Sequence, residues 1–403
     1  MKAAEAEDFS YLRWQEVTDA SCYVNSTAIS GDGTTVVAGS FYHIYTPQMA
    51  ADGIPAQQST APTTFTTYCY SGEGKLLWSD PFEGYQGVYA VAVSGDGSVA
   101  ASGGWYSHVP LKGFVRAYNV AKGPPYLFHY PLNARVNALA LSQDGSTIVA
   151  AADQVYLFQA DNGVFPAEPA VLELKPPPTG QTIPNSAQAV AISSDGTIIL
   201  VGDYYGNVYY VSNDNGKLGT PYIWSNTTLT RLHTIAMTPS AGWFAASGND
   251  STVYVFSDGS MTGNPTAVTG TLKLDTGRIG WIAISDNGQF LTAVGNIGNT
   301  GTVVGIANGA GGTLTKLWET PTAHNPNSTS MTADGKYVTA ADGYPDGNPG
   351  TFYLFAGATG KQIWSYPTTN MNWPMFISPD GSGIAAGSDN GTLYYFTPTE
   401  AKG

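Results

Sequence analysis

One short pattern recurs eight times along the chain, and this repetition limits the possible folds more than any other feature. Each copy has a few apolar residues, then a Ser or Thr, then a turn that usually contains Asp-Gly or Asn-Gly, as in "AVAVSGDG". After a first interval of 64 residues, successive copies lie 45 to 51 residues apart. Repeats of this length indicate an array of similar structural units. The Ser and Thr residues, called anchors below, are Ser30, Ser94, Ser142, Ser193, Thr238, Ser285, Thr332 and Ser378.

Each unit has the pattern of four strands. A small apolar strand such as "TIVAAAD" follows the turn, and a strand rich in β-branched and aromatic residues such as "NVYYVS" follows after a polar loop. A glycine turn and a last strand, often ending in Trp, complete the unit, and no segment shows a sustained helical period. Four-stranded units of about 45–50 residues are typical of propeller blades. We therefore predict an all-β chain in which residues 1–403 form a single domain, an eight-bladed β-propeller of four-stranded antiparallel blades.

The two ends of the sequence predict how the ring closes. The eighth copy stops after its third strand, at "TLYYFTPTEAKG", while the N-terminal segment supplies "FSYLRWQEV" with Trp14 where other outer strands have Trp. We expect the N-terminal strand to complete the last blade, because closure removes the unpaired edges of an open sheet.

The outer strands carry a second pattern, a glycine turn followed by Trp, in "AGATGKQIW" (356–364) and "SGEGKLLW" (71–78), with looser versions at 212–224 and 310–318. These segments resemble the tryptophan-docking repeat of quinoprotein-like (PQQ-like) β-propellers. The resemblance implies that the Trp residues pack between blades: Trp78, Trp224, Trp318 and Trp364. The family includes quinone-dependent dehydrogenases, assembly scaffolds and hydrolases of sulfur compounds, so it implies no single function.

The cysteines argue against a dehydrogenase. Those enzymes carry a vicinal disulfide, whereas the two cysteines here, Cys22 and Cys69, are far apart in sequence. No catalytic residue is carried over, and pyrroloquinoline quinone is not expected. We also expect no Cys22–Cys69 disulfide, because the two residues should lie near opposite faces of the ring, farther apart than a disulfide allows.

Composition suggests partners and location. The net charge is −14 and only 11% of residues are charged, which argues against binding to nucleic acid or to anionic membranes. No apolar run is long enough to span a membrane. The neutral polar composition suggests an extracellular or periplasmic protein, and the start, which lacks the apolar core of a signal peptide, reads as a mature sequence.

The chain has only five arginines, and three of them hold the same position in their repeats. Arg135, Arg231 and Arg278 each lie seven residues before an anchor, at position −7. We expect this position in the loop that leads into the innermost strand, on the face where propellers usually bind ligands. The three arginines should then form a positive arc around one mouth of the central channel.

Position −5 should also lie at this mouth, because it has the parity of the bulky residues at −3 and −1. Its residues are mostly able to form hydrogen bonds: Asn25, Tyr89, Asn137, Gln188, His233, Gly280, Asn327 and Trp373. The predicted ligand-binding residues are Arg135, Arg231, Arg278, His233, Asn25, Tyr89, Asn137, Gln188, Asn327 and Trp373. Alternatively, each arginine pairs with an acid in a neighbouring loop, the candidates being Asp153, Asp203, Asp342 and Glu83.

Several functions agree with this interpretation. The first is a ligand-binding or scaffold protein that holds a small anion, or a protein partner, on this face. The second, suggested by resemblance, is a hydrolase of the tetrathionate type, with Asp203 or Asp342 as acid or base and His233 as proton carrier. A quinone-dependent dehydrogenase is the third, and whether the chain is an enzyme stays open.

Metal sites have weaker support. No two of the five histidines have the spacing of metal ligands. The loop "DGYPDGNPG" (342–350) has acids and carbonyls suited to calcium, although turn chemistry explains its composition equally well. The long insertion at 41–65 is either a lid or partner contact, or an elaborated loop.

Overall fold

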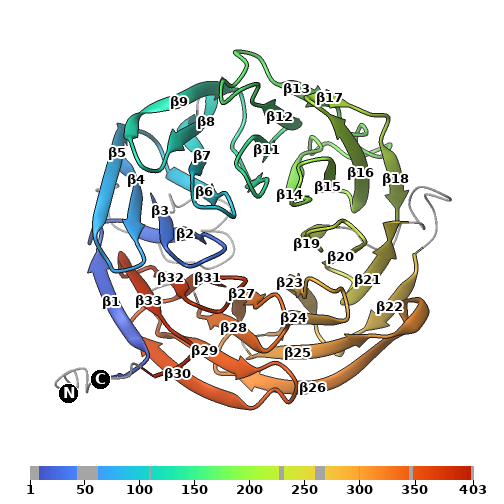
Figure 1. The fold of residues 1–403 in the computed structure, drawn as a ribbon. Helices are drawn as coiled ribbons and strands as arrows, with labels where there is room; N and C mark the ends of the chain where they lie inside the picture. Colours follow the sequence, from blue (N-terminus) through green and yellow to red (C-terminus); the bar gives the residue numbers. More distant parts are fainter. Residues whose placement is uncertain are drawn as a thin grey trace.

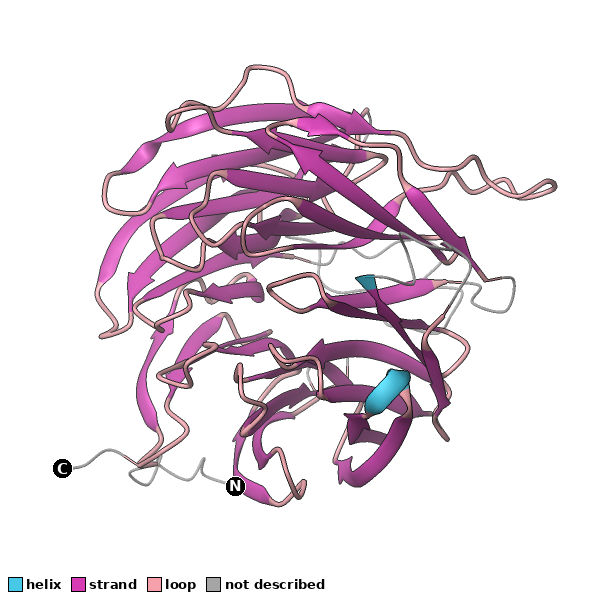
Figure 2. Cartoon of the chain, turned by 45° about the vertical axis from the view of Figure 1, so that its right-hand side comes forward, coloured by secondary structure: helices cyan, strands magenta, loops and turns pink. Residues whose placement is uncertain are grey.

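The computed structural model describes residues 9–42, 62–108, 110–226, 231–258, 268–298, 300–344 and 348–400. Its named elements are β-strands and one 3-10 turn, η1 (Ala310–Gly312), and the strands are arranged around a central opening (Figures 1 and 2). Within these ranges, no helix has the length and apolar character needed to cross a membrane. Most of the 41–65 insertion lies outside the described residues.

The eight strands between Tyr23 and Leu132 form one hydrogen-bonded sheet, which is made of two four-stranded units. The first unit contains β2 (Tyr23–Ile29), β3 (Thr35–Phe41), β4 (Thr64–Ser71) and β5 (Leu76–Glu83). The second contains β6 (Gly87–Val93), β7 (Val99–His108), β8 (Leu111–Asn119) and β9 (Gly123–Leu132). The units are joined because Phe41 of β3 also pairs with Gly87 of β6.

Each of the next three sheets uses strands that are consecutive in sequence. One contains β10 (Ala138–Leu141), β11 (Thr147–Ala151), β12 (Val155–Gln159) and β13 (Ala170–Leu172). The next has five strands: β14 (Ala187–Ile192), β15 (Ile198–Asp203), β16 (Asn207–Asp214), β17 (Lys217–Leu218) and β18 (Tyr222–Ser225). The third contains β19 (Leu232–Met237), β20 (Trp243–Gly248), β21 (Thr252–Ser257) and β22 (Gly270–Lys273).

The last three sheets each have four strands. The first contains β23 (Arg278–Ile284), β24 (Phe290–Ile297), β25 (Thr300–Asn308) and β26 (Leu314–Thr322). The second contains β27 (Pro326–Met331), β28 (Tyr337–Asp342), β29 (Gly350–Ala356) and β30 (Gln362–Thr368). The final sheet contains β31 (Asn372–Ile377), β32 (Ile384–Ser388), β33 (Thr392–Phe396) and β1 (Leu12–Val17). The predicted all-β fold built from four-stranded antiparallel sheets is thus confirmed.

The N-terminal strand lies against the C-terminal one. β1 pairs antiparallel with β33, so segments from the two ends of the sequence share one sheet (Figure 1). Trp14 of β1 stacks on Tyr395, with ring centroids 5.3 Å apart. Its indole N–H donates to the carbonyl of Gly72 at 2.9 Å, which ties this sheet to the next one around the ring.

The repeated turn is held together by its own side chains. In the third copy the Ser142 hydroxyl donates to Asp144 at 2.7 Å and accepts from the backbone N–H of Thr147 at 3.0 Å. The same carboxylate accepts from the N–H of Ser146 at 2.9 Å. Since Ser and Asp satisfy the turn backbone in this way, the repeat recurs for a structural reason. Equivalent anchor-to-carboxylate bonds form in the turns of Ser30, Ser94, Ser193, Thr332 and Ser378.

Tryptophans of the outer strands link neighbouring sheets. The indole N–H of Trp78 in β5 donates to the carbonyl of Val120 at 2.9 Å, and that of Trp318 in β26 donates to Gly357 at 2.6 Å. Trp224 and Trp364 are buried in the apolar clusters between sheets. All four therefore pack between sheets, as expected.

The two cysteines are not joined to each other, as expected. Cys22 and Cys69 are both free, and both are buried. Burial raises the pKa of each thiol to about 12, so neither is a reactive thiolate at neutral pH.

Candidate functional site

The inner strands share a backbone irregularity at the predicted position −5. Seven of the eight inner strands, β2, β6, β14, β19, β23, β27 and β31, shift register there. In β19, for example, Leu232 pairs with Gly248 and Thr234 with Ser247, which leaves His233 as the extra residue. Such bulges bend a strand and redirect a side chain. Nothing in the sequence pattern predicted them.

These residues surround a cavity of about 360 Å³ at the centre of the ring. Nine of the ten predicted ligand-binding residues line it: Asn25, Tyr89, Arg135, Asn137, Gln188, Arg231, His233, Asn327 and Trp373. Apolar residues form other parts of the wall: Val91, Leu139, Val190, Ile235, Trp281 and Phe376. We call this cavity the channel mouth. Arg278 is the predicted residue that is not part of its lining.

Arg135 is held in place by uncharged neighbours. Its Nε donates to the side-chain carbonyl of Asn137 at 2.7 Å. The guanidinium carbon lies 4.2 Å from the ring centroid of Tyr89 and 4.9 Å from that of Trp105. Cation–π contacts orient a guanidinium without supplying a counter-charge, so these three neighbours of Arg135 leave no negative group beside it.

Arg231 and Arg278 are close enough to affect each other. Arg231 stacks over Tyr204 at 5.2 Å, and Arg278 donates through Nε to Asn296 at 3.1 Å. Burial and the charge of Arg231 together lower the pKa of the Arg278 guanidinium. In the described part of the chain, none of Arg135, Arg231 and Arg278 forms an ion pair. The alternative prediction, that they pair with Asp153, Asp203, Asp342 or Glu83, is therefore wrong for these residues.

The predicted position of Arg278 needs correction. It is the first residue of strand β23 rather than part of a loop. Another arginine, Arg116, has a structural role: it lies on β8, is buried and forms an ion pair with Asp80 at 2.8 Å.

His233 stands beside the two cationic groups. One ring nitrogen, Nε2, shares a hydrogen bond with the side-chain oxygen of Asn249. Burial lowers the pKa of the imidazole, and the charges of Arg231 and Arg278 add to this effect. His233 is therefore a neutral hydrogen-bonding group near pH 7.

The two candidate catalytic carboxylates are buried away from the mouth. Asp203 accepts five hydrogen bonds, from Tyr205 N, Asn207 N, Asn207 Nδ2, Asn185 Nδ2 and Tyr209 OH. Asp342 accepts from His324 N, Thr351 N and Tyr353 OH, and burial raises its pKa. Neither residue lines the channel mouth. Their acceptor oxygens already bond the backbone and the next strand, which is a structural role.

The same carboxylate–tyrosine contact recurs in other repeats. Tyr156 donates to Asp153 at 2.9 Å, and Tyr254 donates to Asp250. An acid shortly before a Tyr of the third strand is the sequence sign of this arrangement, and the predictions made from sequence did not include it.

The proposed calcium loop is described only in part. Residues 345–347 lie outside the described residues. Asp342, its first acid, is already used in the hydrogen bonds given above. Among the described residues, no three of His, Cys, Asp and Glu cluster as metal ligands would.

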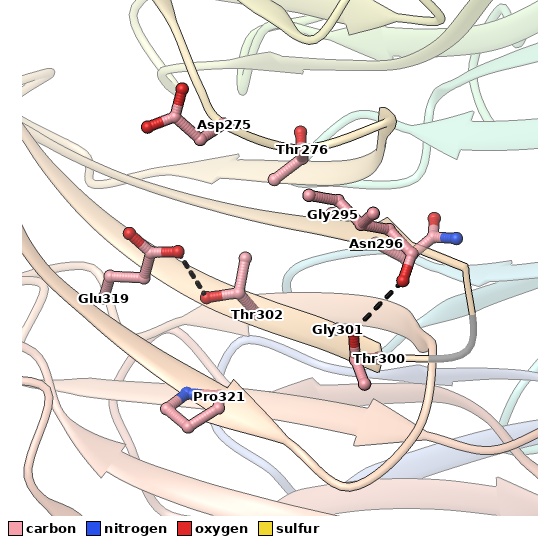
Figure 3. A pocket seen from close by; sticks show the side chains of 10 residues that line it. Asp275, Thr276, Gly295, Asn296, Thr300, Gly301, Thr302, Glu319 and Pro321 are labelled. Carbon is pink, nitrogen blue, oxygen red and sulfur yellow. Dashed lines mark hydrogen bonds between the residues drawn. The ribbon is translucent and has the colours of Figure 1, made fainter.

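A second cavity of about 410 Å³ lies further out on the ring, beside β24, β25 and β26 (Figure 3). Its wall includes Asp275, Asn296, Thr302 and Glu319. Glu319 accepts from Thr302 at 3.2 Å and pairs with Lys316 at 2.8 Å, so this carboxylate already has partners. Asn296, which accepts from Arg278, lies between this cavity and the arginine pair.

Comparison with known proteins shows the fold. No family model matches the chain, and no curated protein matches it in sequence. Sqt1 from Chaetomium thermophilum, in a structure bound to the N-terminus of ribosomal protein L10, is similar with a TM-score of 0.69 and 14% identity. The match covers 94% of this chain and 98% of Sqt1. The Cps50 (Swd1) β-propeller domain from Myceliophteria thermophila has a TM-score of 0.58 and 12% identity, over 77% of this chain and 97% of that domain.

These neighbours are WD40 β-propellers, and this finding corrects the predicted family, the predicted function and the predicted location. The resemblance to PQQ-like propellers is wrong. The reason is that a buried outer-strand Trp is a packing device for any sheet that must contact its neighbour. The tetrathionate-hydrolase and quinone-dehydrogenase functions, which that resemblance suggested, are wrong with it, and the small-anion function predicted from the arginines is not supported either.

The predicted extracellular or periplasmic location is also contradicted, since one neighbour is bound to a ribosomal protein. The predicted location was based on the neutral polar composition of the chain. Much of that composition, the Ser, Thr, Asp and Gly of the repeated turns, has the structural role described above.

Proposed function

We propose that this chain is an interaction scaffold, a single propeller domain of eight blades that binds a segment of a partner polypeptide at the channel mouth. The observation that carries the proposal is the row of bulges at position −5, which brings amide, imidazole and aromatic side chains of successive strands to one cavity. Bulges often occur next to functional sites, where they redirect side chains.

The blade count is supported by the anchors and the sheets. Each of the eight anchors precedes a turn between two adjacent strands of one sheet. The eight-stranded sheet contains two such units, joined by the single Phe41–Gly87 pairing.

The chemistry of the mouth suits a polypeptide. Asn137, Gln188 and Asn327 carry carboxamides, which can both donate to and accept from a peptide backbone. Trp281 and Phe376, with ring centroids 5.9 Å apart, offer an apolar surface for one anchoring side chain. A polar rim with an apolar, aromatic centre is the usual composition of a protein-binding patch.

The structural neighbours support a scaffold of this kind. Sqt1 was crystallised bound to the N-terminus of ribosomal protein L10, which is a terminal segment of another protein. We propose the same class of partner here, a short polypeptide segment, although not the same partner.

Selection from a displayed library of random short peptides would test the proposal. A Gly280→Phe variant closes the mouth, because a Cβ at Gly280 meets only the Pro326 carbonyl at 3.9 Å and the larger side chain has room to extend. The matched control is Gly242→Phe, in the turn between β19 and β20, where a Cβ meets only Ser240 Oγ at 3.4 Å. We expect peptides that bind wild-type and Gly242→Phe protein but not Gly280→Phe. Peptides that bind all three equally would show that the mouth is not the binding surface.

A further inference from the structure

The channel mouth has two chemically different sides. β19, which carries His233 and directly follows Arg231, lies across the central opening from β2, which carries Asn25 (Figure 1). β23, which begins with Arg278, lies next to β19. The first side is cationic. On the second, Asn25 is only 6% exposed, and its carboxamide oxygen has no hydrogen-bond partner among the described residues.

The cationic side is unusual for this protein. The whole chain has a net charge of −14, yet three of its five arginines sit around this mouth. Burial and the nearby charge of Arg231 lower the pKa of Arg278, and within the described residues no carboxylate pairs with either arginine. Two like charges held close together without a counter-charge repel each other, and a negatively charged group beside them would reduce this repulsion.

Space is left beside these charges. Position −5 of β23 is Gly280, the one member of the row without a side chain, and among the described residues the Pro326 carbonyl, at 3.9 Å, is what a Cβ there would meet. Every other residue at this position lines the cavity. The gap therefore lies in the row of side chains that line the mouth, two residues after Arg278 and beside the Pro326 carbonyl of β27.

We propose that the polypeptide segment bound at the mouth is acidic, with a carboxylate side chain that enters the mouth and pairs with Arg231, while Arg278 behind it adds to the positive charge. This inference rests on the proposed function. A backbone N–H of the same segment then supplies the donor that the Asn25 oxygen lacks. The acidic remainder of the protein repels such a segment, so its charge favours docking at the mouth over other surfaces.

The peptide selection distinguishes the outcomes when two variants are added. Arg231→Gln/Arg278→Gln removes both charges, and Arg13→Gln is the matched control, because Arg13 lies on β1, away from the mouth, and donates to Thr397. We expect the mouth-dependent peptides to be net acidic. Their affinity should fall by about tenfold or more in the double variant and stay unchanged in Arg13→Gln.

Two further measurements sharpen the result. Replacing each Asp or Glu of a recovered peptide by Asn or Gln should weaken binding at one position more than at the others. Raising the salt from about 50 mM to about 500 mM should weaken wild-type binding much more than binding to the double variant, because salt screens charge pairs.

The possible failures have different meanings. If the mouth-dependent peptides are neutral or basic, or if the double variant binds them as well as wild-type protein does, the acidic segment is wrong while the scaffold function stands. If no peptide depends on an open mouth, the proposed function fails and this inference fails with it.

Discussion

At the scale of single residues, the repeated turn depends on a glycine three positions after each anchor. Seven of the eight turns have Gly there with positive φ, whereas the fifth has Ala241 with φ of 55°. A side chain in this left-handed region costs about 1–2 kcal/mol relative to the usual conformations. We therefore expect Ala241→Gly to raise the free energy of unfolding by about 0.5–1 kcal/mol, measured by urea denaturation.

The control for this prediction is the reverse change in the eighth turn. Gly381 has φ of 76°, and a Cβ there meets Thr332 at 3.2 Å. Gly381→Ala should lower the free energy of unfolding by about 1–2 kcal/mol. If Ala241→Gly also destabilises the protein, the strain argument is wrong.

The turn carboxylates predict a response to acid. Hydrogen bonds from Ser193 and Thr197 lower the pKa of Asp195, while burial acts weakly in the other direction. A depressed folded pKa means that the stabilisation is complete above the unfolded value, about 3.9, and is lost as pH falls through the folded value. Asp195→Asn should therefore cost less than about 1 kcal/mol at pH 7, and this cost should shrink as pH falls below the unfolded value.

Urea midpoints of wild-type and Asp195→Asn protein from pH 7 to pH 3 would check this. Wild-type protein is compared with one variant because other carboxyl groups also change the stability of the whole protein with pH. Burial raises the pKa of Asp286 and Asp342, and this makes stability change with pH in the opposite direction. A constant difference between the two proteins across this range would contradict the assignment.

Residue positions at the mouth were partly predictable from sequence. Parity placed position −5 on the channel side, and nine of the ten residues chosen in this way and from position −7 line one cavity. Arg278 was wrongly predicted to line the cavity. The direction of a side chain at a strand start depends on the local backbone, and the Arg278 side chain donates to Asn296 and lies outside the lining. The bulges were not predictable, because an extra residue in a ladder appears only when both paired strands are known.

At the scale of elements, the outer strands are attached to neighbouring sheets by tryptophans whose hydrogen bonds differ. The Trp78 indole donates to Val120, whereas the buried Trp364 indole N–H has no partner among the described residues. Trp78→Phe should therefore lower the free energy of unfolding by about 1–2 kcal/mol through the lost bond and contacts. Trp364→Phe should cost less, because it also removes an unpaired donor.

Denaturation of the two variants side by side gives this difference directly. A larger loss in Trp364→Phe than in Trp78→Phe would mean that packing, and not the hydrogen bond, attaches the outer strands.

The element pattern was the easiest part to predict. Turns with Asp-Gly and aromatic third strands have strong local preferences, so the four-stranded sheets followed from sequence. The family did not, because glycine turns followed by Trp serve packing in propellers of different function. The short strand β17 has two residues and is formed by a local turn. It was not predicted, because it is not part of the repeated pattern.

At the scale of the whole molecule, β1 holds the two ends of the chain together. Deleting residues 1–17 would leave β33 as an open edge and remove the Trp14–Tyr395 stack. We expect a loss of several kcal/mol out of a total stability of about 5–15 kcal/mol, together with self-association through the exposed edge. Thermal melts and size-exclusion chromatography would measure both effects.

A synthetic peptide of residues 9–20 should restore the melting temperature of the truncated protein, whereas a scrambled peptide should not. Unchanged stability after the deletion would show that the ring does not depend on this strand.

The most direct test of the central role given to the channel mouth is hydrogen–deuterium exchange of the wild-type protein with and without a peptide recovered by selection. We predict slower exchange in the segments that lead into the inner strands, at residues 133–138, 184–189, 276–281 and 368–374. Slower exchange confined to the outer strands β5, β9 and β13, with no change in those segments, would contradict the account.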